Sequence, residues 1–439
     1  MPPFFSAHSH HSMVLESRSV VFLRTSSVAR IPVYAHLRSL GLKMVVVHPN
    51  LNDAFEGLFD HWIVHDTNDI DALERVLDTE LPRLGVCPDA ILSFDEYAVY
   101  PAACLAQRRG LRPIPLPPSA IAHTSVKSDF RSFCDAHGIN SPRYCPVRSC
   151  TDDLDALMRG MTFPVVVKPS PGAGSLLAKL CGTMEELAQH AAHMWRVLSA
   201  HPDAKHYLAL GSPVHLLVEE YIGGQEVDID CVVENGVVRF ASISDNFEVC
   251  PPYFVEQGGL CPSALPEHAK SALMELLHSF VRAHGAALHG VLHFEAKYDF
   301  ARERAYVVEV NCRLGSAETN TMISTVYGGL QLGECLVRLG LNLPLTNLRE
   351  EHRTPITHCA SVNIYPEQEG VLSNLEVPTS DKSLVAFSVS AQPGQYVAPP
   401  PKTFYLLCWM VADGATAAAA VNNIRRIKEA FVQEVHTPQ

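Results

Sequence analysis

The sequence predicts a mixed α/β and α+β protein, and three features of the chain lead to this expectation. Short apolar strands alternate with amphipathic helices from Ser19 to about Pro118, which is typical of a parallel α/β sheet. The later part of the chain holds strand pairs joined by short turns, interspersed with long helices, which is typical of α+β lobes. The 439 residues are enough for several domains of about 100–200 residues each.

The front domain is expected over residues 18–118, after a His- and Ser-rich tail over 1–17 that we expect to be disordered. The first strand-to-helix turn, RTSSVAR at 24–30, contains no glycine, so a GxGxxG dinucleotide fingerprint is excluded. A cluster of prolines over 113–118 marks the end of the domain. The alternation predicts a Rossmann-like layer, with strands at 19–23, 44–48, 61–65 and 90–94 and helices at 33–40, 70–81 and 99–110.

Longer elements are expected after the prolines. A hairpin is predicted over 227–244, because Asn235 and Gly236 form a dipeptide that favours tight hairpin turns. The predicted helices are 130–138, 183–198, 269–288 and about 417–433. The predicted strands are 163–169, 216–222, 290–300, 304–314, 360–365, 384–390 and 404–411.

The charge balance excludes a general nucleic-acid binder. The 34 Lys and Arg against 47 Asp and Glu give a net charge of −13, whereas nucleic-acid and acidic-membrane surfaces require a basic face. No apolar run reaches the about 18 residues of a membrane-spanning helix, and no secretory signal pattern opens the chain. The 13 cysteines are scattered without a CxxC pair, which favours reduced thiols in the cytoplasm over disulfides or a zinc site.

Two neighbouring predicted strands carry the strongest chemical signal. Glu295 interrupts the mostly apolar strand HFEAKYD, and Glu309 and Asn311 alternate with valines in VVEVNCR. The period of two along a strand places Glu309, Asn311 and Arg313 on one face, and an antiparallel neighbour would add Glu295. Two carboxylates and an amide oxygen suit Mg²⁺ held between protein and phosphates. The alternative is a solvated strand face or paired charges, against which the apolar flanks argue.

A second signal is the strand and loop FPVVVKPSPGAGS at 163–175. The strand delivers Lys168 directly before a loop of small residues that includes Gly172, Gly174 and Ser175. Glycine lets backbone N–H groups approach phosphate oxygens, and lysine adds a point charge. The GxxxxGK[ST] pattern of a Walker A loop is absent, and an ordinary hairpin loop is the alternative for this segment taken alone.

A third signal is LLVEEYIGGQE at 216–226, where acidic residues flank a Gly-Gly pair. A purine needs backbone donors and acceptors at its edge, and a ribose needs a carboxylate for its hydroxyl groups. Glu219, Glu220 and Glu226 are the candidates for such nucleotide contacts. Considered alone, they have the alternative of being ordinary polar residues of a loop.

The order of these segments resembles that of the ATP-grasp superfamily. Lys127, Lys168, the glycine loop, the 216–226 segment and the two acidic strands follow one another as they do there. Within the superfamily the chain looks most similar to carboxylate–amine ligases, namely the carnosine synthases and the bacterial L-amino acid ligases. The likeness is carried by GVCPD (85–89), SDN (244–246), PPYFVEQG (251–258), GVLHFEAKYD (290–299), VEVNCRLG (308–315) and PGQYVAPP through VADGAT (393–416).

The resemblance implies an ATP-grasp fold in which two α+β lobes sandwich ATP. It implies a small lobe over 119–222 with the phosphate loop, a large lobe over 223–345 with the metal site, and a C-terminal α+β subdomain over 346–439. The implied cofactors are ATP and two Mg²⁺ ions, for which Mn²⁺ substitutes. Amino acids are the implied small-molecule partners, and a homodimer is the implied assembly.

The resemblance also implies roles for individual residues. Lys127 and Lys168 would contact the ATP phosphates, with Lys168 also near the adenine, and the 172–175 loop would close over the β- and γ-phosphates. The implied adenine-binding residues are Glu219 at the amine and Glu220, Tyr221 and Ile222 along the edge, while Glu226 would hold the ribose. Magnesium would be bound by Glu295, Glu309 and Asn311, with Glu309 bridging the two ions. Cys312 departs from the pattern, since many members have proline there.

Arg313, Lys168 and Glu309 are the expected catalytic residues, with Arg313 stabilising the transferred phosphate. For the substrates, Glu256 would hold an ammonium group and Arg313 would meet a carboxylate. His293 is a further candidate, for which a packed strand histidine is the alternative. Asp228 and Asp230 are also candidates, and the solvated face of a hairpin is the somewhat favoured alternative for them.

The implied reaction joins two amino acids in an ATP-dependent manner through an acyl phosphate, and releases ADP, phosphate and a dipeptide. Two alternatives stay open. A non-catalytic ATP-binding regulatory module would have been favoured by loss of Glu295, Glu309 or Asn311, all of which are present. A carboxylase-type ATP-grasp enzyme is the other, and the SDN and PPYFVEQG segments argue against it.

Overall fold

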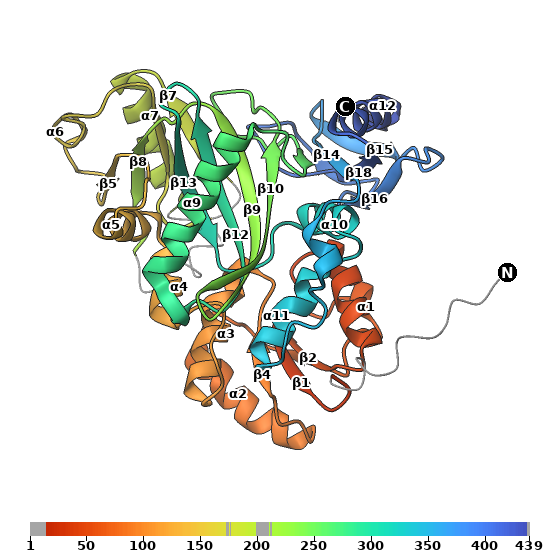
Figure 1. Cartoon of the computed structure of the whole chain (residues 1–439). Helices are drawn as coiled ribbons and strands as arrows, with labels where there is room; N and C mark the ends of the chain where they lie inside the picture. Colours follow the sequence, from red (N-terminus) through yellow and green to blue (C-terminus); the bar gives the residue numbers. More distant parts are fainter. Residues whose placement is uncertain (1–14, 173–174, 176, 199–209, 211–212, 437–439) are drawn as a thin grey trace.

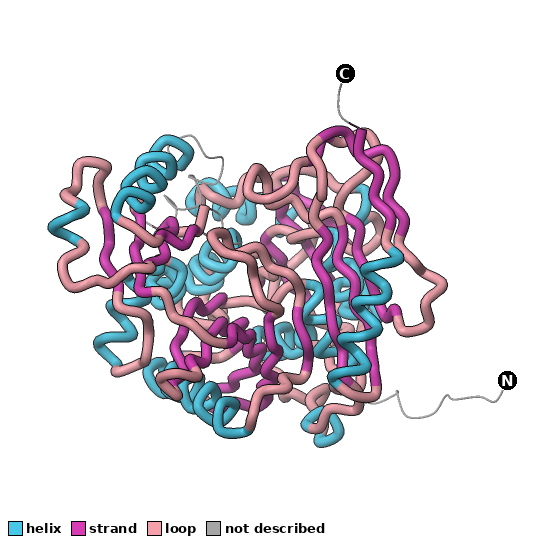
Figure 2. The backbone as a smooth tube through the Cα atoms, turned by 90° about the horizontal axis from the view of Figure 1, so that it is seen from above, coloured by secondary structure: helices cyan, strands magenta, loops and turns pink. Residues whose placement is uncertain are grey.

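The computed structural model describes residues 15–172, 175, 177–198, 210 and 213–436. Within these residues the strands form four sheets, of four, eight, three and four strands. The architecture is mixed α/β and α+β, as the sequence predicts. The small lobe and the C-terminal strands lie at opposite ends of the molecule (Figures 1 and 2), and the front domain lies below the long central sheet in the view of Figure 1.

The front domain is a parallel sheet with a helix after three of its strands. The turns after β1 and β4 open onto one crevice, because the strand order reverses between these two strands, and open α/β sheets bind ligands at such a point. The strand order is β3-β2-β1-β4, with β1 (Ser19–Leu23), β2 (Lys43–His48), β3 (His61–Val64) and β4 (Ala90–Leu92). The helices are α1 (Ile31–Ser39), α2 (Ile70–Arg83) and α3 (Glu96–Arg108).

Packing of the front domain begins before the predicted end of the tail. Leu15 is fully buried in the same core as Val20 and Tyr34. Gly41, at φ +79°, leaves room for Glu16, whose Cγ would lie 2.5 Å from an added Cβ. The prediction of a disordered tail is therefore wrong for its last residues, because an apolar side chain close to β1 joins the core. Residues 1–14 lie outside the described part of the chain.

The small lobe is built on an antiparallel sheet in the order β5-β8-β6-β7. In the register of β6 and β8, Lys168 lies opposite Leu217 and Glu219 lies opposite Val166, so the two charged residues are diagonal neighbours on one face. The strands are β5 (Tyr144–Val147), β6 (Val165–Pro169), β7 (Lys179–Cys181) and β8 (Leu216–Glu220), and the helices are α4 (Pro118–Ser125), α5 (Lys127–His137), α6 (Leu154–Leu157) and α7 (Met184–Leu198).

The central sheet has eight strands in the order β13-β12-β9-β10-β11-β14-β18-β16. Helix α9 (Glu267–His284) packs on it, and the rings of Phe280 and Phe294 lie 5.7 Å apart. Pairing of β11 with β14 carries the sheet past residue 345, so the boundary predicted there falls within one continuous sheet. The strands are β9 (Gln225–Glu234), β10 (Val237–Asn246), β11 (Gly259–Cys261), β12 (Gly290–Asp299), β13 (Arg304–Asn311), β14 (His358–Ile364), β16 (Leu384–Val389) and β18 (Cys408–Gly414).

The last helix is shorter than expected. Helix α12 (Ala417–Ala430) ends before Phe431, which is extended, and β19 (Val432–His436) then pairs with β15 (Gly370–Glu376) beside β17 (Tyr396–Val397). The prediction of helix to residue 433 is therefore wrong at its end, since two valines in VQEVH favour a strand.

Two helices that were not predicted connect the large lobe to the rest of the molecule. These are α10 (Ala317–Val326) and α11 (Leu332–Gly340). Gly333 of α11 packs on Val33, and Gly340 packs on Leu92, so α11 belongs to the core of the front domain. The end of β13 and the start of α10 are thereby held next to the turns after β1 and β4.

Candidate active site

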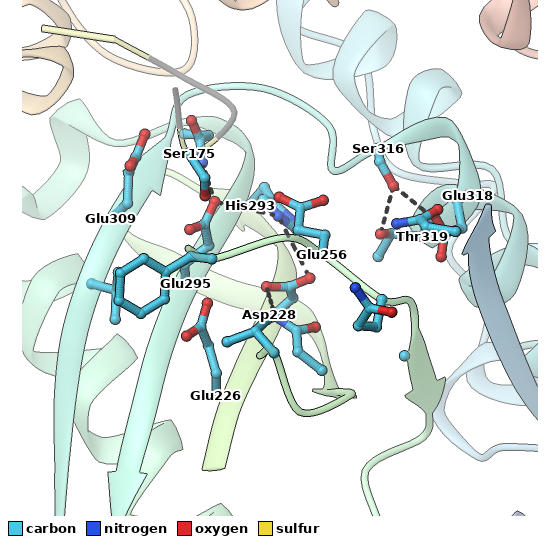
Figure 3. Close-up of a pocket in the computed structure, with 18 of the residues that line it drawn as sticks. Ser175, Glu226, Asp228, Glu256, His293, Glu295, Glu309, Ser316, Glu318 and Thr319 are labelled. Carbon is cyan, nitrogen blue, oxygen red and sulfur yellow. Dashed lines mark hydrogen bonds and ion pairs between the residues drawn. The ribbon is translucent and has the colours of Figure 1, made fainter. Parts of the chain in front are cut away.

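A cavity of about 940 Å³ lies where the front domain, the small lobe and the central sheet meet. The described candidates that line it are Lys127, Lys168, Gly172, Ser175, Glu219, Glu220, Tyr221, Ile222, Glu226, Glu256, His293, Glu295, Glu309, Asn311 and Arg313. Gly174 lies outside the described residues. Figure 3 shows acidic side chains gathered around His293, with Ser175 of the phosphate loop beside Glu295 and Glu309. Segments far apart in sequence thus meet in one cavity.

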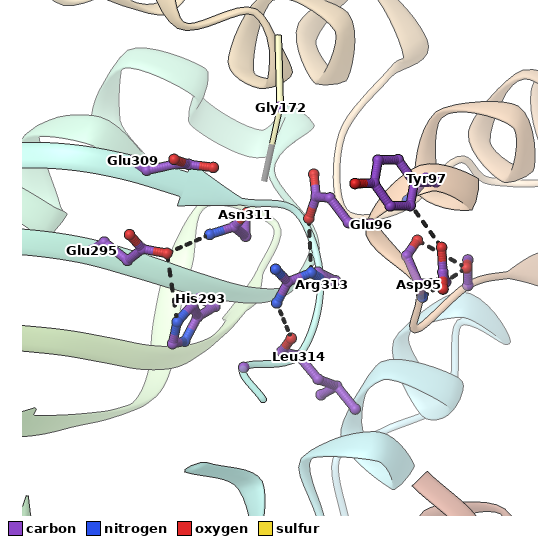
Figure 4. A network of polar contacts seen from close by, with 12 residues as sticks. Asp95, Glu96, Tyr97, Gly172, His293, Glu295, Glu309, Asn311, Arg313 and Leu314 are labelled. Atoms are coloured by element: carbon purple, nitrogen blue, oxygen red, sulfur yellow. Dashed lines mark hydrogen bonds and ion pairs between the residues drawn. The ribbon is translucent and has the colours of Figure 1, made fainter. Parts of the chain in front are cut away.

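Glu295 and Glu309 form a carboxylate pair across two antiparallel strands. In the register of β12 and β13, Glu295 lies opposite Glu309 and His293 lies opposite Asn311. The Nδ2 atom of Asn311 donates to Oε1 of Glu295 at 2.9 Å (Figure 4). Burial and the neighbouring charge of Glu309 raise the pKa of Glu295 well above its usual value.

Lys127 compensates the charge of Glu309. Its Nζ atom lies 3.1 Å from Oε2 of Glu309 and also donates to the backbone oxygen of Gly172 in the phosphate loop. Burial alone would raise the pKa of Glu309, but Lys127 and Lys168 outweigh it and lower that pKa. A single lysine therefore joins the loop to the carboxylate pair.

The donor set fits a hard divalent cation. Two carboxylates and the oxygen of an amide that can turn toward them are ligands that Mg²⁺ prefers, and a cation would cancel the repulsion between Glu295 and Glu309. Across the described part of the chain, no group of three or more His, Cys, Asp or Glu side chains could hold a metal ion by itself. Asn311 and oxygens of a bound ligand would therefore complete the coordination.

A buried triad of charges links the two lobes. Oε2 of Glu219 lies 2.6 Å from Nζ of Lys168, and its Oε1 accepts a 2.6 Å hydrogen bond from Nε of Arg131. Arg131 also donates to the backbone oxygen of Val308 on β13. Burial would raise the pKa of Glu219, but the two cations outweigh it and lower that pKa to about 2. Arg131, on α5, was not predicted because nothing in its local sequence marks it.

Lys297 organises the segment expected to face adenine and ribose. Its Nζ atom lies 3.3 Å from Oε2 of Glu226, donates to the backbone oxygen of Ile222 at 3.2 Å, and lies 5.1 Å from the ring centre of Tyr221. Lys297 occurs in the HFEAKYD strand, but the sequence analysis gave it no role. Glu220, which also lines the cavity, pairs with the more exposed Arg302 at 2.8 Å.

Arg313 is held by the front domain. Its Nε atom lies 2.7 Å from Oε2 of Glu96, the first residue of α3, and its Nη1 donates to the backbone oxygen of Leu314 at 2.8 Å (Figure 4). Burial raises the pKa of Glu96, and Arg313 acts in the opposite direction. Glu96 was missed, although its place at the start of the helix that follows β4 was a usable signal.

His293 is part of an ion-pair network and not a packed strand histidine. Its Nδ1 atom lies 3.0 Å from Oδ1 of Asp230, and its Nε2 lies 3.8 Å from Oδ2 of Asp228. Burial would lower the pKa of His293, but the two aspartates outweigh it and raise that pKa to about 10. The favoured alternative of a solvated face is wrong for both aspartates, because the side chains of Asp228 and Asp230 are only 15% and 1% exposed.

The far end of the cavity is acidic. Glu256 and Glu318 line it together with Asn363 and Tyr365 of the segment around β14. Burial, followed by the charge of Asp228, raises the pKa of Glu256. Glu318, Asn363 and Tyr365 were missed, although the alternation of polar and apolar residues in SVNIY indicates a strand with one polar face.

A family model described as an ATP-grasp domain matches residues 161–321. This range contains the 163–175 strand and loop, the 216–226 segment and both acidic strands. The match assigns an ATP-grasp domain to these residues, and with the mixed α/β architecture it shows an ATP-grasp fold similar to that of carboxylate–amine ligases.

The relatives make this likeness more specific. Carnosine synthase 1 of Gallus gallus is 30% identical over 346 residues, which are 76% of this chain and 36% of that protein. The chain spans well under half the length of the curated relatives it matches.

Solved structures share the fold over most of the chain. The L-amino acid ligase from Bacillus licheniformis superposes with a TM-score of 0.85 and 16% identity, over 96% of this chain and 100% of that one. The biotin carboxylase domain of the Hydrogenobacter thermophilus 2-oxoglutarate carboxylase, crystallised with MgADP and bicarbonate, gives a TM-score of 0.70 and 16% identity, over 95% and 90% of the two chains. No helix in the described ranges has the length and apolar composition to cross a bilayer.

Proposed function

We propose that the protein is an ADP-forming ligase that joins two amino acids into a dipeptide through an acyl phosphate. The observation that carries the proposal is the geometry of one end of the cavity. There Glu295, Glu309 and Asn311 face Lys127 and the phosphate loop, and Arg313 lines the same cavity. Acyl transfer to and from phosphate needs charge stabilisation and positioning more than a covalent nucleophile.

The nucleotide would lie between the lobes. In this proposal Lys127, Lys168 and the 172–175 loop, including Gly172, Gly174 and Ser175, hold the phosphates. Glu219 meets the adenine amine, and Glu220, Tyr221 and Ile222 lie along the adenine edge. Lys297 supports that segment, and Glu226 takes the ribose hydroxyl groups. Two Mg²⁺ ions, replaceable by Mn²⁺, would be held by Glu295, Glu309 and Asn311.

The reaction then proceeds in two steps. The carboxylate of the first amino acid attacks the γ-phosphorus, the bond to the β-phosphate oxygen breaks, and ADP is released. The amine of the second amino acid attacks the acyl carbon, the bond to phosphate breaks, and the proton of the amine leaves to phosphate or solvent. Magnesium would supply Lewis-acid stabilisation of the phosphoryl charge. Lys168, Glu309 and Arg313 are the proposed catalytic residues.

The acidic end of the cavity suits the ammonium group of an amino acid. Glu256 is the proposed partner of that group, because it lines the cavity beside Asp228 and carries no ion pair among the described residues. His293 would hold Asp228 and Asp230 in place. A homodimer in the cytoplasm completes the proposal, and the 13 unpaired cysteines support a reducing compartment.

The proposal is tested by ATP cleavage with Mg²⁺ against a matrix of amino-acid pairs, with products read by mass spectrometry. The expected result is ADP and phosphate that appear only with particular pairs, together with a product mass equal to the two substrates minus water. ATP cleavage stimulated by bicarbonate would instead favour a carboxylase. ATP binding without any cleavage would favour a regulatory module.

A further inference from the structure

Arg30 stands at the turn that follows β1, in the segment RTSSVAR, whose sequence predicts no function. It ends a short 3₁₀ turn, Val28–Arg30, and directly precedes α1. The neighbouring residues Ser26 and Ser27 line the cavity, as Arg30 itself does. The turn after β4 lines it too, through residues 94–97. The crevice between β1 and β4 therefore opens into the proposed active site.

The guanidinium of Arg30 is buried but incompletely bonded. Arg30 is 3% exposed, and its Nη2 donates to the backbone oxygen of Gly315. Its Nη1 is buried without a hydrogen-bond partner in the part of the chain that the structure describes. A buried cationic donor without a partner is costly, so a small turn of the Arg30 side chain toward the cavity that it lines would let a ligand satisfy Nη1.

The surroundings of Arg30 favour an anion. Burial, followed by the positive charge of Arg313, lowers the pKa of Arg30 to about 10, while Tyr34, Asp230 and Asp95 act in the opposite direction. Arg30 and Arg313 both line the cavity, and only the guanidinium of Arg313 has a carboxylate in contact with it among the described residues. A planar carboxylate is the group that matches the forked donors of arginine.

The chemistry of the proposed reaction indicates which of the two amino acids would supply the carboxylate that binds Arg30. The acid-donating amino acid loses its carboxylate to the acyl phosphate, at the end of the cavity near Glu309. The carboxylate of the amine donor does not react, and it needs a cation of its own when it enters the cavity.

We propose that Arg30 binds the α-carboxylate of the amine-donating amino acid, with the crevice between β1 and β4 as its subsite. This inference rests on the proposed ligase function. The crevice would place the donor on the front-domain side of Arg313, so that its amine points toward the acyl phosphate.

The test separates the two steps with hydroxylamine, which attacks acyl phosphates and carries no carboxylate. Arg30→Met should raise the KM for the amine donor about 10- to 100-fold, as expected for loss of a charge-assisted hydrogen bond. Hydroxamate formation from the acid donor should stay at the wild-type rate. The carboxamide of the amine donor should react poorly with wild type, and the variant should no longer prefer the free acid. Arg30→Lys should recover part of the affinity.

Arg38→Met is the matched control, because Arg38 lies on α1 with a side chain that is 43% exposed and bonds only to the surface residues Leu58 and Asp60 among those described. Its kinetics should equal those of wild type. Equal loss of hydroxamate and dipeptide in folded Arg30→Met would overturn the inference and leave the ligase proposal standing. Absence of both products in wild type would overturn the ligase proposal.

A binding measurement does not depend on turnover. The 20 common L-amino acids and their carboxamides are titrated against wild type and Arg30→Met in the presence of MgADP, and thermal unfolding is followed. At least one amino acid should stabilise wild type more than its carboxamide does, and Arg30→Met should remove that difference. Equal stabilisation by acid and amide in wild type would sink the inference.

Discussion

The Nε atom of Arg313 lies 2.7 Å from Oε2 of Glu96. Arg313 follows β13 of the central sheet, and Glu96 opens α3 of the front domain, so this pair joins two separate sheets at the wall of the cavity. Arg313 is intermediate in exposure, and Glu96 is the carboxylate that fixes its direction. The proposed phosphate-binding guanidinium is therefore positioned by a carboxylate of the front domain.

Glu96→Gln should lower kcat about 10-fold or more, in line with the about 1.5–3 kcal/mol of a hydrogen bond between charged groups. The substitution keeps the shape of the side chain and removes the charge that holds Arg313. The KM for ATP should change little, because Glu96 lies away from the adenine segment. Steady-state kinetics at saturating amino acids measure both quantities. An unchanged kcat would mean that Arg313 does not need this partner.

Glu309→Gln should reduce ADP formation about 100-fold or more, since a carboxylate in the proposed metal-binding role supplies several kcal/mol of charge stabilisation. Glu295→Gln should shift the Mg²⁺ requirement to higher concentration. Both variants should keep the circular dichroism of wild type. A coupled assay for ADP across a Mg²⁺ titration measures the effect.

Glu303→Gln is the control for these two variants. Glu303 lies in the exposed turn between β12 and β13, on the same hairpin but away from the cavity, and its substitution should change neither rate nor Mg²⁺ dependence. Normal ADP production by Glu309→Gln would refute the metal assignment.

Periodicity predicts most strands and helices because burial of one face imposes it. The apolar run at 19–23 is β1, the Asn235-Gly236 turn joins β9 to β10, and the helix expected at 183–198 is α7. The predictions are wrong where a contact between residues far apart in the sequence determines the local structure. Leu15 leaves the predicted tail because the front core accepts it, and residues 432–436 form β19 because β15 offers an edge.

The candidate site is predictable from sequence to the extent that its residues share a strand. Glu295, Glu309 and Asn311 are linked by the period of two and one antiparallel register. Arg30 and Arg131 reach the site from other elements of the chain, and no local pattern marks them. Their roles depend on which segments pack together, so they become visible only in the fold.

Arg131→Met should lower the free energy of unfolding by about 3–5 kcal/mol, the usual cost of breaking a buried ion pair. Arg131 is fully buried, and its loss leaves Glu219 with Lys168 alone. Urea denaturation measures the change. Arg108→Met is the control, because Arg108 pairs with Asp71 and Glu74 with 42% of its side chain exposed, and such pairs contribute about 0–1 kcal/mol. Equal losses in the two variants would contradict a special role for the buried triad.

Glu318 should make the stability of the protein fall as pH rises toward neutrality. Burial, followed by the charges of Glu256 and Asp228, raises its pKa from 4.5 to about 7, against a hydrogen bond from Ser361 that acts in the opposite direction. Between these two values the folded protein holds a proton that the unfolded chain releases. The contribution of Glu318 to the free energy of unfolding is therefore fully present below pH 4.5 and is lost as pH rises through about 7.

Glu318→Gln removes this loss, because the amide does not ionise. The free energy of unfolding of the variant should rise relative to that of wild type as pH rises from 5 to 8. The difference should reach at most about 3 kcal/mol at pH 8. Urea unfolding at several pH values measures the difference. Glu350→Gln is the control, since that side chain is 90% exposed, and its curve should follow wild type throughout. A constant offset between Glu318→Gln and wild type at every pH would show that Glu318 does not titrate between pH 5 and 8, and would contradict a pKa near 7.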